Sequence, residues 1–75
     1  MNYVREHSHC TSVLRYAAAS GCYSIEINDN AGRLLCYDAS ISADSIESLH
    51  KRADELTLQA APHHCHCDGW MRFSV

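Results

Sequence analysis

The middle of the chain alternates between apolar and polar residues, a pattern that predicts consecutive strands. One side of the segment 22–28 is apolar, so that side of the strand should face a core. The segment 34–37 is apolar at every position, which is typical of a central strand. Short polar stretches ending in Gly21 and Gly32 precede the two segments, and these glycines suit turns that need a positive φ. The segments therefore predict a meander.

The segment 12–17 allows two interpretations. It is the first strand of the meander if the turn at Gly21 matches the turn at Gly32. It is a helix if apolar residues spaced by three and four positions share one face and Gly21 forms the C-cap. The residues with that helical spacing are Tyr3, His7, Cys10, Leu14 and Ala17. The strand is favoured because the two turns are alike, and the helix remains the alternative.

A helix is predicted from about Ala43 to Leu56 or Leu58. Ser42 is a suitable N-cap, and Ile41 and Ile46 stand where a hydrophobic staple would place them. One apolar stripe then follows the helical period. It consists of Ile46, Leu49, Ala53 and Leu56.

The C-terminal segment after Gly69 predicts a last strand with two different sides. Met71, Phe73 and Val75 share one side, which suits the core. The other side carries Trp70, Arg72 and Ser74, and its exposure depends on what lies over it.

Together these elements predict a single α+β domain spanning residues 1–75. The expected order is β-β-β-α-β, a four-stranded antiparallel sheet with one helix packed on one face, and the alternative order is α-β-β-α-β. The opposite face must then be polar, form a homodimer or bind a partner. The expected core consists of Leu14, Tyr23, Ile25, Ile27, Leu34, Ile46, Leu49, Ala53, Leu56, Met71 and Phe73.

Composition excludes several classes of protein. The formal charge of -3 without a basic cluster speaks against direct binding of nucleic acid. No apolar run approaches the roughly 20 residues of a membrane span, and the polar N-terminus does not resemble a signal peptide. The 5 cysteines are an odd number, which favours reduced thiols and a cytoplasmic location.

A cluster of histidine and cysteine near the C-terminus is the most distinctive chemical feature. In an extended segment, His63, Cys65 and Cys67 would point to one side, as ligands that suit zinc. A fourth ligand would come from the N-terminal group of His7, His9 and Cys10. The C-x-C spacing is less usual for zinc than C-x-x-C, so the alternatives are a solvated loop that binds no metal and a redox or copper-binding role.

The sequence shows no arrangement that predicts catalysis. The Cys and His side chains of 63–67 lie in one loop without a rigid scaffold, and the acidic residues suit a solvated surface. The three glycines are isolated and form no phosphate-binding loop. We therefore expect a protein that is not an enzyme.

The size and the layout from Gly21 to Leu56 resemble small phage-encoded anti-defence proteins, in particular anti-CRISPR inhibitors. Many of these are single α+β domains in which a hairpin precedes a helix. The resemblance implies a protein that occludes a surface of a larger protein or ribonucleoprotein complex in the host cytoplasm. It also implies contacts through exposed aromatic and acidic residues.

The expected contact surface is centred on Trp70 and Arg72, with Tyr37 and Asp38 as further members, because aromatic residues and Arg dominate binding hot spots. Tyr37 could equally belong to the core. The alternative function is that of a small zinc-stabilised domain with a different cellular role, which uses the cluster at 63–67.

Overall fold

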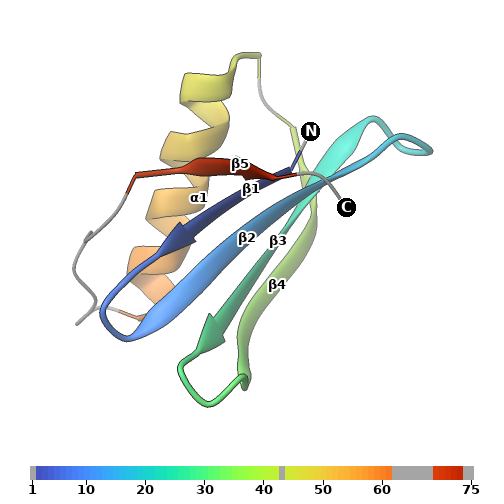
Figure 1. Cartoon of the computed structure of the whole chain (residues 1–75). Coiled ribbons are helices and arrows are strands. Elements are labelled where there is room, and N and C mark those ends of the chain that lie inside the picture. The colour runs from blue at the N-terminus through green and yellow to red at the C-terminus, as the bar shows by residue number, and fades with distance from the viewer. Residues whose placement is uncertain (1, 43, 62–68, 74–75) are drawn as a thin grey trace.

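The computed structural model describes residues 2–42, 44–61 and 69–73, in which one helix crosses one face of a five-stranded sheet (Figure 1). The strand order is β4-β3-β2-β1-β5, and every neighbouring pair is antiparallel. The elements are β1 (Asn2–Glu6), β2 (Cys10–Ala17), β3 (Cys22–Asp29), β4 (Leu34–Ile41), α1 (Ile46–Ala60) and β5 (Met71–Phe73).

The α+β class with an antiparallel sheet is confirmed, but the prediction of four strands is wrong. The segment 12–17 lies within β2, so the α-β-β-α-β alternative is also wrong. The extra strand is β1, which turns tightly into β2 through a hydrogen bond of 2.9 Å from the His7 N–H to the Cys10 carbonyl. β1 was missed because its five residues show too little alternation to separate a strand from a polar terminus.

Both predicted glycine turns are present. Gly21 has φ 70° and Gly32 has φ 83°, which only glycine adopts without steric cost. The second turn is also held by the Asp29 carboxylate, which accepts hydrogen bonds from the backbone N–H of Ala31 and Arg33 at 3.0 and 2.8 Å. These turns set the register of the meander from β2 to β4.

The helix begins later than predicted. Ser45 is the N-cap, and its hydroxyl accepts the Ser48 N–H at 3.2 Å, so Ser42 does not cap the helix. Ile41 ends β4 inside the core, whereas Ile46 is 50% exposed, so the staple is wrong too. The segment 42–48 contains three serines. The residue at which β4 ends determines which of them becomes the N-cap of α1.

The core lies between α1 and the sheet. Five predicted core residues are buried there: Leu14, Ile25, Ile27, Leu49 and Ala53. Tyr3, Cys10 and Ile41 complete it. The prediction is wrong for Leu34, Ile46 and Met71, which are 53%, 50% and 49% exposed. Leu34 is exposed because β4 is an edge strand with only one face under the helix, where a central strand was expected.

The two sides of the last strand are reversed relative to the prediction. Arg72 pairs with Tyr3, which is buried beneath α1, so Arg72 and Trp70 share the helix side of β5. Met71 pairs with Val4 and lies on the opposite face. An alternating pattern separates two sets of residues, but it cannot say which set the helix will cover.

Candidate binding surface

The predicted contact residues do not form one surface. Trp70 and Arg72 lie at the β5 edge, whereas Tyr37 and Asp38 lie on β4 at the opposite edge of the sheet. Tyr37 is 57% exposed, so it is not core. The Asp38 carboxylate accepts hydrogen bonds from the Ser40 N–H and hydroxyl at 2.9 and 2.8 Å, and these bonds lower the Asp38 pKa.

Trp70 packs against the helix instead of standing free. Its indole stacks on the His50 ring, with centroids 5.0 Å apart and planes at 16°. The His50 ring also meets Tyr3 edge-on, at 4.8 Å and 79°. The contacts among these three aromatic rings pack α1 against β1 and against the residue just before β5.

Charged groups border this aromatic cluster. Arg5 donates to Asp54 at 2.9 Å, which ties β1 to α1 one turn beyond His50. Burial lowers the pKa of His50, and the Arg5 charge adds to that effect while the Asp54 carboxylate opposes it. The His50 Nε2, Asp54 Oδ1 and Trp70 Nε1 atoms are buried and have no hydrogen-bond partner in the described part of the chain.

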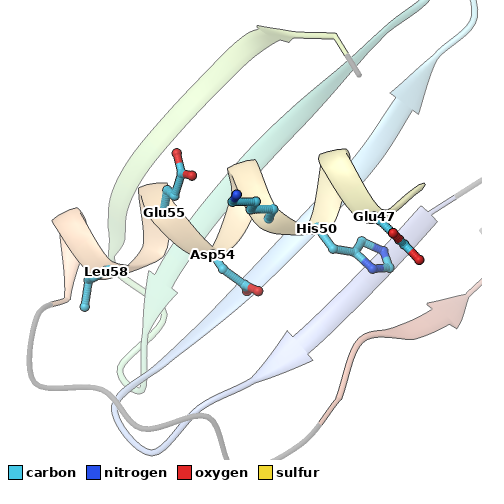
Figure 2. Close-up of a pocket in the computed structure, with 6 residues that line it drawn as sticks. Glu47, His50, Asp54, Glu55 and Leu58 are labelled. Carbon is cyan, nitrogen blue, oxygen red and sulfur yellow. The ribbon is translucent and has the colours of Figure 1, made fainter. Parts of the chain in front are cut away.

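An open depression of about 440 Å³ runs along α1 beside this cluster (Figure 2). Its described lining comes from the helix alone and includes the acidic residues Glu47, Asp54 and Glu55. In Figure 2, Asp54 and His50 point toward β1, whereas Glu55 points away from it. The described side chains therefore line one wall of a shallow groove, and they do not converge on a point.

A buried chain of polar groups links the sheet to the C-terminal half of α1. The Thr57 hydroxyl donates to the Ala53 carbonyl at 2.8 Å, so it accepts the Ser12 hydroxyl at 2.7 Å. Ser12 in turn accepts from His7 Nε2 at 3.3 Å. The Ser12 hydroxyl is fully buried and commits its proton to Thr57, so this Ser–His pair is not arranged to attack a substrate.

The predicted zinc ligands His63, Cys65 and Cys67 lie outside the described residues. Of the N-terminal candidates, Cys10 is buried in the core, and burial raises its pKa, which disfavours the thiolate that zinc needs. His9 is exposed in the turn between β1 and β2. Within residues 2–42, 44–61 and 69–73, no group of three potential ligands is close enough to hold a metal ion.

The face of the sheet opposite α1 carries a row of five facing residues, one on each strand, and four of the five are apolar. The strand registers place its members side by side, each directly opposite the next. They are Met71, Val4, Val13, Glu26 and Tyr37. This set is called the stripe below. Figure 1 shows α1 on one side of the sheet only, so in the described part of the chain no helix covers the stripe.

On the three inner strands β1, β2 and β3, polar residues border the stripe on both sides, two positions away along each strand. One flank consists of Asn2, Arg15 and Ser24, and the other of Glu6, Thr11 and Asn28. On the outer strands the flanks are apolar, with Phe73 opposite Asn2 and Leu34 opposite Asn28. Glu26 is the one charged member of the stripe, and its Oε2 is 3.5 Å from Arg15 Nη1 and 3.2 Å from Asn28 Nδ2. An apolar centre with a polar rim is the usual anatomy of a protein interface.

Sequence reasoning found Tyr37 but missed Val4, Val13 and Glu26. Val13 was assigned to a strand, but the sequence does not show which face of the sheet its side chain lies on, because that depends on the position of the helix. No family model, curated protein or solved structure matches this chain. No helix in the described part of the chain is long and apolar enough to span a membrane.

Proposed function

We propose that the protein binds a larger protein or ribonucleoprotein complex and acts by occluding the surface that it covers. The stripe is the observation that supports this proposal, because it aligns four apolar side chains and Glu26 across all five strands, with polar residues beside it on the three inner strands. Tyr37 and Met71 stand at its two ends and are 57% and 49% exposed. Tyrosine is among the residues that most often dominate binding energy.

The charge inside the stripe is compatible with burial under a partner. An isolated carboxylate loses much of its hydration when a partner covers it, which weakens binding. Glu26 already has Arg15 and Asn28 as partners from its own chain. Its ion pair and hydrogen bond replace part of the hydration that a bound partner would remove.

The resemblance to anti-CRISPR inhibitors suggests a specific form of this function, in which the target is a nuclease or surveillance complex. The test is transformation of bacteria that carry an active CRISPR–Cas system with a plasmid that the system targets. Expression of the protein should restore transformation, and Tyr37→Ala should reduce the effect at least about tenfold. Tyr16→Ala is the matched control, because Tyr16 is a similarly exposed tyrosine on the helix side.

The general binding proposal is tested separately by a photo-cross-linking amino acid. Placed at Tyr37, it should capture the target from cells in which the protein acts. Placed at Lys51, on the outer side of α1, it should not. Equal capture at both positions, or capture only at Lys51, would contradict the use of the stripe. Restored transformation without capture of a CRISPR–Cas component would contradict the inhibitor form.

A second candidate function is a zinc-stabilised domain. The Ser12–Thr57 contact ties β2, just after the turn that carries His9, to the last turns of α1, from which the chain continues toward His63. The turn with His9 therefore lies at the end of the molecule where the described part of α1 ends. This arrangement supports a metal with His9 as the N-terminal ligand, and the chelation experiment in the Discussion tests it.

A further inference from the structure

We propose that the free protein is a reversible homodimer in which two copies pack their stripes face to face. This inference rests on the proposed function, because it assigns a second occupant to the same surface. In the described part of the chain one helix covers one face of the sheet, and the stripe leaves four aligned apolar side chains on the other. Until the target is present, a second copy is the partner whose stripe has the same length and shape.

The charges on the two flanks are self-complementary under a two-fold axis along the stripe. Such an axis lays each stripe on its own equivalent and exchanges the flanks. The flank with Arg15 then faces the flank with Glu6 of the other copy, and the reverse contact repeats it. Packed sheets lie about 10 Å apart, so Arg15 stays paired with Glu26 of its own chain while its positive charge lies across the gap from Glu6 of the partner copy.

The area of contact predicts a weak dimer. Five strands about 4.8 Å apart and three positions about 6.8 Å apart give about 480 Å² on each copy, or about 1,000 Å² in total. This is the lower limit for a specific interface. A weak dimer suits a surface that must be released when the target binds.

The same axis places the two Glu26 side chains opposite each other. Each has Arg15 and Asn28 as partners in its own chain, but the two carboxylates still repel. Removal of this charge should therefore strengthen self-association, whereas a charge in the apolar part of the stripe should weaken it. The two variants should thus shift the dissociation constant of the dimer in opposite directions, which nonspecific association would not do.

Sedimentation velocity over a range of concentrations tests the proposal with the intact chain. The wild type should pass from monomer to dimer as concentration rises. Val4→Lys should weaken self-association about tenfold or more, because the axis brings the two added charges opposite each other. Val4 lies opposite Val13 and Met71, so the added charge is not paired with Glu26. Glu26→Gln should shift the transition to lower concentration. Leu58→Lys is the control, because Leu58 is 55% exposed on α1, away from the stripe.

Circular dichroism should first show that Val4→Lys is folded. If it is not, Met71→Lys at the exposed end of the stripe replaces it. A wild type that stays monomeric throughout, or a dimer weakened equally by Val4→Lys and Leu58→Lys, would overturn the inference. Target capture at Tyr37 by a protein that never dimerises would leave the proposed function intact. A dimer that captures no target would support the inference and contradict the function.

Discussion

The hydroxyls of Ser12 and Thr57 meet at 2.7 Å in the interior, joining β2 to α1 across 45 residues of sequence. Thr57→Val removes the acceptor of the Ser12 proton and should lower the free energy of unfolding by about 1–3 kcal/mol. The paired variant Ser12→Ala/Thr57→Val removes both hydroxyls of this contact and should recover part of that loss. Denaturant unfolding of the wild type, Ser12→Ala, Thr57→Val and the paired variant measures the coupling. Purely additive effects would show that the hydroxyls do not interact.

Leu49 is 2% exposed and is the most buried large apolar side chain on the described part of α1. Leu49→Ala should lower the free energy of unfolding by about 2–5 kcal/mol, because it leaves a cavity between the helix and the sheet. Leu58→Ala, on the exposed side of the same helix, should change it by less than about 0.5 kcal/mol. Similar losses in both variants would argue against this orientation of α1.

Trp70 should contribute to stability, which differs from the expectation that it is a free contact residue. Trp70→Ala removes the ring that stacks on His50, so it should lower the free energy of unfolding by about 1–3 kcal/mol. Thermal unfolding measures the change. A melting temperature equal to that of the wild type would mean that the stack does not hold β5 to the helix, and would restore Trp70 as a contact candidate.

His50 should make stability fall in mild acid. Burial lowers its pKa below the ordinary value of 6.5, so the unfolded chain binds the proton first as the pH drops. The stability that neutral His50 provides is complete above pH 6.5 and is lost as the pH falls through the pKa of the folded protein. His50→Phe keeps an aromatic ring on Trp70 and cannot be protonated.

Chemical unfolding at a series of pH values should therefore show a smaller loss of stability below neutrality for His50→Phe than for the wild type. The comparison cancels the other histidines, which are common to both proteins. An equal or steeper loss in the variant would contradict the burial effect and would indicate that Asp54 dominates the pKa of His50.

The zinc-site hypothesis predicts that a bound metal ion raises the melting temperature of the protein. Native mass spectrometry should show one bound ion, and a chelator should lower the melting temperature because the metal binds the folded state. Cys65→Ser and Cys67→Ser should remove the ion. Cys10→Ser should retain it, because the buried Cys10 is a poor source of thiolate. An unchanged melting temperature in chelator and a metal-free mass would contradict the site.

The sequence by itself determined the local elements of this protein. The alternation in 22–28 and the glycines at 21 and 32 predicted β3 and both turns, because strand period and positive φ depend on near neighbours. The period of the apolar residues also predicted that Leu49 and Ala53 face the core.

Only the tertiary structure decided which side of each strand became the outer surface. The alternation in β5 separates Met71 from Trp70, but the position of α1 and the pairing with β1 select Trp70 for the helix side. The same choice turns Val4 and Val13 outward and aligns them with Met71 and Tyr37. These residues are up to 67 positions apart, so the stripe exists only through the register of five paired strands.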